Sequence, residues 1–230
     1  MNGKLLGNAV MSLIATAAFY TKVVRPRINA WGSTDEELRA SLPLDERVQD
    51  PRFVQQLAMT IDATPDVIWP WIVQLGEPPR AGYYSFTSIE KLVGLDVVNQ
   101  ERILPEFQEV HVGEALDKNG TMVVQAVEPR HYMVLGPPAS VSEVQATWTF
   151  YLQPIDDYST RLISRCRADW DLKNTLTTSD PMLWAMTLMI EPGAFIMTWK
   201  MLKTIKRLAE THDLQPDVAF TPTAFAREAA

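Results

Sequence analysis

The stretch FVQQLAMTIDATPDVIWPWIVQLG, from Phe53 to Gly76, decides the fold. Apolar and polar side chains alternate in its first part, FVQQLAMTIDA, which is typical of a strand with one buried face. The triplet Thr64-Pro65-Asp66 then begins a helix: a hydroxyl can cap the first turn, proline needs no donor there, and a carboxylate lies near the positive helix end. Pro70 bends this helix and Gly76 ends it. The stretch therefore predicts a strand that leads into a short, bent helix.

The rest of the chain predicts one more short helix, a run of strands and a long final helix. The second helix is expected from Ser85 to Gly94. Five segments with a period of two follow without helices between them, which indicates an antiparallel meander. They are EVHVGEAL, TMVVQAVEP, HYMVLGPP, VQATWTFYLQP and TRLISRCRADW. The final helical pattern runs from Ser179 to His212, and we expect Pro192 to kink or split it near Glu191.

This order of elements defines an α+β fold class. A curved antiparallel sheet is wrapped around a long C-terminal helix, with two short helices after the first strand and an extra N-terminal helix. One helix does not easily fill the concave face of a curved sheet, so the order also predicts a cavity between the two. The expected divisions are an N-terminal apolar helix at 1–30, a surface arm at 31–52, the main domain at 53–212 and an irregular tail at 213–230.

Composition excludes several classes of function. The 230 residues carry a formal net charge of -7, which argues against binding of nucleic acid, because phosphates require a clustered excess of Lys and Arg. The single cysteine, Cys166, cannot form an internal disulfide, and the three histidines lack the spacing of metal ligands. No nucleophile-elbow, zinc-protease or glycine-rich phosphate motif is present. We expect no metal and no cofactor.

The uncharged segment from Leu5 to Thr21 leaves three alternatives open. It is short for a transmembrane helix, which needs about 20 apolar residues. It can be a membrane-associated anchor, a helix docked on the protein or on an oligomer partner, or a cleaved signal. The basic cluster that follows favours a cytoplasmic body, with a membrane contact through residues 5–21. The oligomeric state stays open.

Two polar segments are predicted to be solvated. The acidic stretch from Trp31 to Pro51 contains many helix breakers and one short helix signal, with Ser33 or Thr34 as its cap, and we expect a surface arm there. In the last strand, Arg165, Arg167 and Asp169 alternate with small residues, and we expect this charged row to face water.

The order of elements and several strings resemble the bacterial SRPBCC superfamily of START-like, polyketide cyclase and lipid-transport proteins. The strings are WGSTDEEL, IDATPDVIWPWIVQLG, RAGYYS, RILPE and EPGAFIMTWKMLKTIKRLAE, within Trp31 to Glu210, and they are similar to an uncharacterised branch. The resemblance implies a helix-grip fold with an internal hydrophobic pocket, but no single reaction. The chain departs from the branch at Ala194, Thr198 and Trp199, where polar groups are usual, and at Leu44, where glycine is usual. These changes argue against a polar active site and favour apolar binding, or a contact with a membrane or a protein.

Three residues are candidates for catalysis. Glu191 is a carboxylate between apolar neighbours, where burial would suit a general acid, although a structural ion pair is the plain alternative. Arg80 lies in a turn before the second helix, where it could pair with Glu191 or with a ligand carboxylate. Tyr83 could donate its hydroxyl into a mostly apolar cavity.

The candidates for ligand contact are apolar or aromatic side chains that would face the cavity. They are Trp69, Tyr84, Trp148, Met186, Ile190, Phe195, Met197 and Met201. Methionine adapts to ligands of imprecise shape, but each of these side chains can equally be ordinary core. The sequence predicts binding or transport of a hydrophobic small molecule or lipid. The alternatives are a cyclase or dehydratase acting by acid/base catalysis, and a protein-interaction module.

Overall fold

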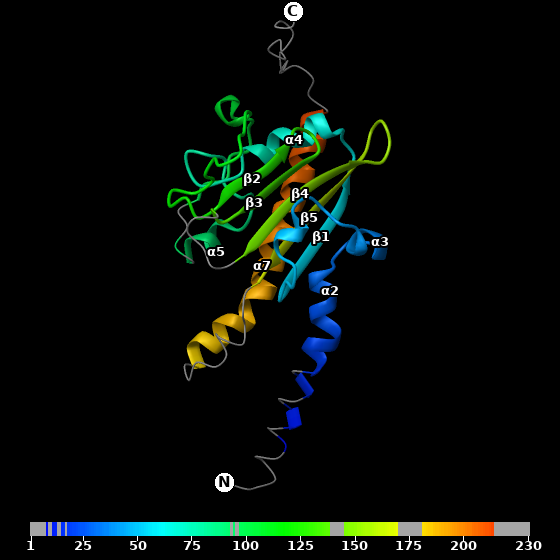
Figure 1. Cartoon of the computed structure of the whole chain (residues 1–230), viewed down its shortest axis with the longest axis vertical. Helices are drawn as coiled ribbons and strands as arrows, with labels where there is room; N and C mark the ends of the chain where they lie inside the picture. The colour runs from blue at the N-terminus through cyan, green and yellow to red at the C-terminus, as the bar shows by residue number, and fades with distance from the viewer. Residues whose placement is uncertain are drawn as a thin grey trace, which may run out of the picture.

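The computed structural model describes residues 8, 11–12, 15–16, 18–92, 94, 97–138, 145–169 and 181–213, and for 92, 181–190 and 212–213 it describes the backbone alone. One antiparallel sheet forms the centre, with a long helix across one face (Figure 1). The N-terminal helices and the first turns of the long helix project from the same end of the sheet (Figure 1).

The sheet joins the first and last strands of the chain. Its order is β1-β5-β4-β3-β2 and every pair is antiparallel. The strands are β1 (Phe53–Ile61), β2 (Val123–Glu128), β3 (Tyr132–Gly136), β4 (Ala146–Pro154) and β5 (Thr160–Ala168). The predicted meander is confirmed, and β1 closes it by pairing along the whole of β5.

The first of the five expected strand segments, EVHVGEAL, is not a strand. It forms one isolated bridge, Ala115 to Val123, and its residues Gly113, Glu114 and Leu116 make single backbone hydrogen bonds to Val124 and Met122. Gly113 adopts a positive φ there, and the Glu114 carboxylate accepts a hydrogen bond from the backbone N–H of His111. This local turn breaks the extended backbone that the alternating pattern suggested.

Short helices follow β1 as predicted. Helix α4 (Pro65–Val73) contains Pro70, and α5 (Thr87–Leu92) is shorter than the expected helix. Thr64 is the N-cap of α4, but its side chain makes no capping hydrogen bond. A single 3-10 turn, η3 (Pro105–Phe107), lies in the long connection to β2.

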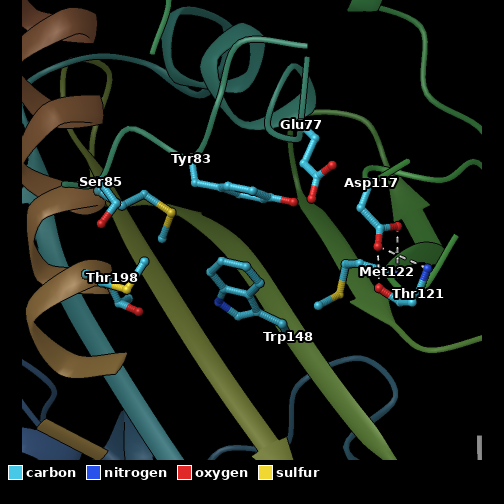
Figure 2. A pocket seen from close by; sticks show the side chains of 10 residues that line it. Glu77, Tyr83, Ser85, Asp117, Thr121, Met122, Trp148 and Thr198 are labelled. Atoms are coloured by element: carbon cyan, nitrogen blue, oxygen red, sulfur yellow. Dashed lines mark hydrogen bonds between the residues drawn. The ribbon is translucent and has the colours of Figure 1, made fainter. Parts of the chain in front are cut away.

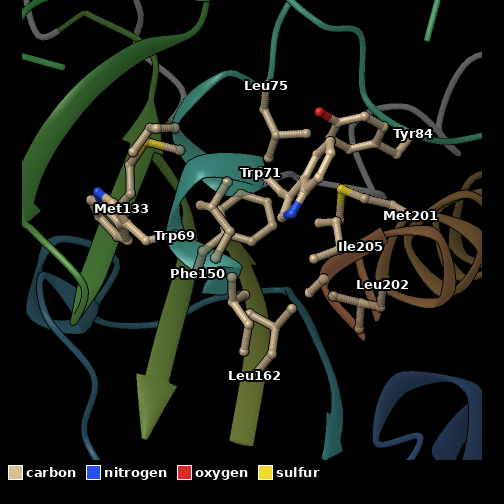
Figure 3. Packing of buried hydrophobic residues seen from close by; sticks show 14 of the residues in the cluster. Trp69, Trp71, Leu75, Tyr84, Met133, Phe150, Leu162, Met201, Leu202 and Ile205 are labelled. Carbon is tan, nitrogen blue, oxygen red and sulfur yellow. The ribbon is translucent and has the colours of Figure 1, made fainter. Parts of the chain in front are cut away.

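Helix α7 (Pro181–Asp213) runs through Pro192 as one helix, so the expected split near Glu191 does not occur. Its second half packs on the main hydrophobic core through Met201, Leu202 and Ile205, which face side chains from α4, β4 and β5 (Figure 3). Burial of large apolar side chains from both layers is the main force that holds helix and sheet together. The α+β helix-grip architecture predicted from the sequence is confirmed.

The N-terminal segment docks on this body. The π-helix η1 (Tyr20–Val24) continues into α2 (Arg25–Asn29), and α2 contacts both α7 and β1. No helix in the described part of the chain is long and apolar enough to cross a bilayer. Contact with a membrane through residues 5–21 stays a prediction.

The arm at 31–52 covers the sheet face opposite to α7. Its helix α3 (Asp35–Arg39) has the predicted Thr34 cap, completed by a capping box with Glu37. A 3-10 turn, η2 (Asp45–Arg47), follows Leu44, whose φ of 63° lies in the left-handed region that favours glycine. The backbone of this turn therefore gives a reason for a glycine at position 44.

The expectation that the charged row of β5 faces water is wrong for Arg165. Its side chain is only 3% exposed and forms an ion pair with Asp45 beneath the arm. The guanidinium also donates to the Ala40 carbonyl at 2.8 Å and to the Glu37 carbonyl at 2.6 Å. The arm is therefore anchored on the sheet through Asp45, although most of its residues are exposed.

Candidate functional site

A cavity of about 280 Å³ lies between α7 and the sheet. Ten residues from α7, β4, the loops around Gly76 and Asp117 and the segment before α5 line it (Figure 2). They are Glu77, Tyr83, Ser85, Asp117, Thr121, Met122, Trp148, Met197, Thr198 and Met201. The predicted space between sheet and C-terminal helix is present.

The walls of the cavity are mostly apolar. Met122, Met197 and Met201 supply flexible thioether side chains, and the Trp148 ring lies among them on the sheet side (Figure 2). The indole N–H of Trp148 donates to Ser164 Oγ at 2.9 Å, so the ring is held in one orientation. One rigid aromatic surface thus faces several adaptable side chains, an arrangement that suits an apolar ligand.

A pair of glycines brings two polar residues to the cavity. Gly76 and Gly82 exchange backbone hydrogen bonds of 3.1 and 2.9 Å, which closes the loop between Glu77 and Ala81. A Cβ on Gly76 would lie 2.5 Å from the Leu116 carbonyl oxygen, and its φ is +137°. Only glycine fits this close approach, which places Glu77 and Tyr83 at the same cavity.

The hydroxyl of Tyr83 points toward the acidic side of the cavity (Figure 2). Burial raises the pKa of Tyr83, and the negative charges of Glu77, Asp117 and Glu90 raise it further, against a smaller opposite effect of Arg80. The phenol therefore stays protonated. It can donate a hydrogen bond, but it cannot act as a base near neutral pH.

Asp117 keeps its negative charge at this side. Burial alone would raise the pKa of its carboxyl, but hydrogen bonds from Thr121 and from the backbone N–H groups of Thr121 and Met122 outweigh that effect and lower it. The two backbone bonds are each 3.1 Å long. Asp117 is thus an ionised carboxylate fixed by its own turn.

Ser85 has a buried hydroxyl without a hydrogen-bond partner in the described structure. The residue is 6% exposed and is one of those that line the cavity, next to α7 (Figure 2). Asn99 holds this segment by accepting from the Tyr84 N–H at 2.7 Å and donating to the Ser85 carbonyl at 3.0 Å. A buried polar group without a partner is unfavourable, so the Ser85 hydroxyl is unusual among the polar groups beside the cavity.

Glu90, on α5, is a second buried group without a partner. It is completely buried and neither carboxylate oxygen accepts a hydrogen bond in the described structure. Burial raises the pKa of Glu90. Its carboxyl is close enough to Tyr83 to influence the phenol, although it does not line the cavity.

The structure separates the predicted ligand contacts into two groups. Trp148, Met197 and Met201 line the cavity, as does Tyr83. Trp69, Tyr84 and Phe195 belong to the hydrophobic core and are not among the lining residues. Met186 and Ile190 lie in the part of α7 where side chains fall outside the described residues.

The two adjacent tyrosines point to different places. Tyr84 adopts a φ of 54°, and its ring packs edge-on against Trp71 at 6.2 Å between centroids. Its hydroxyl accepts a hydrogen bond from the Gln74 side chain. The positive φ therefore turns Tyr84 into the core, while Tyr83 stays on the cavity.

Glu191 does not meet Arg80, contrary to the pairing considered from the sequence. Its carboxylate forms a two-pronged ion pair with Arg25 of α2, at 2.7 and 2.8 Å, and accepts from the Tyr20 hydroxyl at 3.4 Å. It is not among the residues that line the cavity. The geometry gives Glu191 a structural task, which is to hold the N-terminal helix against α7.

The side chain of Arg80 also interacts with groups that do not line the cavity. Its side chain is buried and forms an ion pair with Glu114, and it donates to the Val73 and Leu75 carbonyls at 2.8 and 3.3 Å. Its guanidinium lies 5.0 Å from the centre of the Phe107 ring. The expected contact of Arg80 with a ligand carboxylate is therefore not available in this arrangement.

Sequence reasoning missed Glu77, Ser85, Asp117, Thr121, Met122 and Thr198 as lining residues. Glu77 follows Gly76, and Asp117 precedes a Lys-Asn-Gly turn, so the sequence indicates a loop at each position. Nothing in the sequence indicates that the two loops meet at one cavity. No group of three or more His, Cys, Asp or Glu in the described residues could hold a metal ion. Burial raises the pKa of the Cys166 thiol to about 12, which makes it a poor nucleophile.

Fold and cavity together define the class: an α+β helix-grip protein with an apolar pocket beneath its C-terminal helix. No family model and no curated protein matches the sequence. Among solved structures, similar chains include the polyketide-cyclase-like protein Cgl2372 from Corynebacterium glutamicum, at 13% identity over 72% of this chain and 96% of that chain, with a TM-score of 0.37.

Two further neighbours have the same level of similarity. Norcoclaurine synthase from Thalictrum flavum is 14% identical over 75% of this chain and 95% of that chain, with a TM-score of 0.35. The di-domain aromatase/cyclase StfQ of the steffimycin biosynthetic pathway is 12% identical over 73% of this chain and 54% of that chain, with a TM-score of 0.41. The resemblance to polyketide cyclase-like proteins is thus found again, as a likeness of fold alone.

Proposed function

We propose that this protein binds an apolar small molecule in the cavity between α7 and the sheet. The observation that carries the proposal is a Met- and Trp-lined space between helix and sheet, whose lining includes Ser85 with its buried hydroxyl that has no partner in the described structure. A volume of about 280 Å³ is close to the lower end of known ligand pockets. A compact ligand suits it better than a lipid with two acyl chains.

Filling the cavity is expected to abolish binding without unfolding the protein. In Met197→Trp, the larger ring would occupy the space that the ligand needs, and affinity should fall at least tenfold. Native mass spectrometry of the purified protein, followed by calorimetric titration with a panel of apolar small molecules, measures this.

The matched control is Ile196→Trp. Ile196 directly precedes Met197 on α7, is 42% exposed and does not line the cavity. The Ile196→Trp variant should bind the ligand as the wild type does. Equal affinity of wild type and Met197→Trp for every ligand that binds, or the absence of any binding to the wild type, would contradict the proposed function.

A cyclase or dehydratase is the second candidate, and the state of Tyr83 favours it. A protonated phenol in an apolar cavity can stabilise negative charge that develops on a carbonyl oxygen. The catalytic group would then be Tyr83, with Ser85 beside the substrate, in place of Glu191 and Arg80.

In that case Tyr83→Phe should reduce turnover of a linear poly-ketone substrate by about 10²-fold or more and leave its binding nearly unchanged. Product analysis by liquid chromatography and mass spectrometry checks this. Tyr158→Phe, at a residue that is 80% exposed, is the control and should keep full turnover. Unchanged turnover in Tyr83→Phe would remove Tyr83 from the chemistry.

A further inference from the structure

We propose that the ligand of this pocket carries a protonated basic nitrogen, which lies against Glu77 and Asp117. This inference rests on the proposed binding function and names the chemical class of the ligand: an apolar amine. Three observations support it: the lining residues carry negative charge, the buried Arg80 guanidinium is paired with other groups, and polar groups lie at the two ends of the cavity.

The lining carries negative charge and no positive charge. Glu77 and Asp117 are among the ten residues, and none of the ten is Lys, Arg or His. Asp117 is held by hydrogen bonds within its turn. The Glu77 carboxylate, by contrast, accepts one long hydrogen bond, 3.4 Å from the Lys118 backbone N–H. Glu77 therefore retains acceptor capacity for a ligand.

The buried guanidinium of Arg80 does not neutralise the carboxylates of Glu77 and Asp117. Arg80 is committed to Glu114 and to two carbonyl oxygens. On α7, Lys200 and Lys203 lie over the rings of Phe86 and Trp199, at 5.7 and 4.6 Å. Burial is the main reason why the pKa of Tyr83 is raised, and the negative charges of Glu77, Asp117 and Glu90 add to that effect more than Arg80 opposes it.

The apolar walls of the cavity strengthen the effect of these two carboxylates on a bound ligand. Between Met122, Trp148 and Met201 water is displaced when a ligand enters, and electrostatic interactions strengthen in such a medium. A carboxylate ligand would be placed next to like charges, and a neutral one would bring no positive charge to Glu77. An ammonium group would pair with the Glu77 carboxylate. The site therefore selects among ligands both by repelling anions and by attracting cations.

The opposite end supplies an independent sign of a ligand. Ser85 and Thr198 lie beside α7, whereas Glu77, Asp117 and Thr121 lie across the cavity from them (Figure 2). The Ser85 hydroxyl is buried and without a partner in the described structure. The pocket thus has a carboxylate end, an apolar middle and a hydroxyl end, which matches an apolar body with a cationic head.

The test compares matched ligands that differ only in the head group. Calorimetric titration of the full-length protein at pH 7 would use an amine, an alcohol and a carboxylate, each on 4-phenylbutyl, 4-cyclohexylbutyl and octyl chains. On the chain that binds best, the amine should bind at least tenfold more tightly than the alcohol, and the carboxylate more weakly than the alcohol.

Glu77→Gln removes the charge and keeps an acceptor for the Lys118 N–H. In this variant the amine preference should fall below threefold while the alcohol binds as before. Glu106→Gln, at an exposed carboxylate on η3, is the matched control and should keep the wild-type preference.

The outcomes separate the two proposals. If the alcohols bind but the amines bind no better, or if the preference survives unchanged in Glu77→Gln, the amine inference is overturned and the binding function stands. If none of the nine compounds binds, both are overturned.

Discussion

Arg165→Met is expected to lower the free energy of unfolding by about 3 kcal/mol, because the buried Asp45 carboxylate loses its closer ion pair and keeps only Arg167, whose Nε lies 3.6 Å away. The side chains of Arg165 and Asp45 are 3% and 9% exposed. Asp45 also accepts from the Leu42 N–H at 2.9 Å, and Arg165 Nε donates to Gln56 at 2.5 Å. The loss therefore extends to the hydrogen bonds that fix the arm on the sheet.

Urea unfolding followed by circular dichroism measures this change. The double variant Arg165→Met/Asp45→Leu should recover a large part of the lost stability, since both charges are then removed together. Arg207→Met, which breaks an exposed ion pair with Glu101, should change stability by about 0–1 kcal/mol. Equal midpoints for Arg165→Met and wild type would show that the arm does not depend on the pair.

Glu90→Met is expected to raise the free energy of unfolding by roughly 1–3 kcal/mol at pH 8. It replaces a completely buried carboxyl, which has no hydrogen-bond partner in the described structure, with an apolar side chain of similar length. The gain should be smaller at pH 5, where the wild-type carboxyl is protonated to a greater extent in the folded protein than at pH 8, because burial raises its pKa.

The sign follows from the direction of the pKa shift. Burial raises the pKa of Glu90 in the folded state above its ordinary value of 4.5. Above pH 4.5 the unfolded chain loses this proton first, so the folded state holds more protons. Stability then falls as pH rises, until the folded-state pKa is passed.

Unfolding curves at several pH values between 5 and 8 check this. As the pH rises from 5 to 8, the free energy of unfolding should fall less for Glu90→Met than for the wild type. Glu109→Met, at an exposed position, is the control and should follow the wild-type pH dependence. A Glu90→Met protein that is less stable than wild type at pH 8 would show that the carboxyl has a favourable partner.

The order of strands and helices could be predicted because it depends on local patterns. The alternation in β1, the Thr34 cap and the Pro65 helix start are all expressed over a few residues. The segment EVHVGEAL has the same kind of pattern, but the turn at Gly113 and Glu114 overrides it. Periodicity alone cannot show whether a neighbouring strand is available for pairing.

The partners of the charged residues could not be predicted, because they are far away in the sequence. Glu191 meets Arg25, and Arg165 meets Asp45, across separations of 166 and 120 residues. An alternating strand looks solvated on its charged face unless something covers that face, and here the arm does. For the cavity, Met197 and Met201 followed from the helix pattern, whereas Glu77 and Ser85 depend on how the loops close.

The pairing of the first and last strands sets the order in which this chain can be built. Asp45 leaves the ribosome 120 residues before Arg165. Until β5 is synthesised, β1 has no neighbour and the arm has no surface to cover. Local elements such as the β2–β3 hairpin can form early, but the arm seats only when the sheet is complete. In a nascent chain of this protein, β1 therefore lacks its partner strand while the whole segment between Ile61 and Thr160 is synthesised.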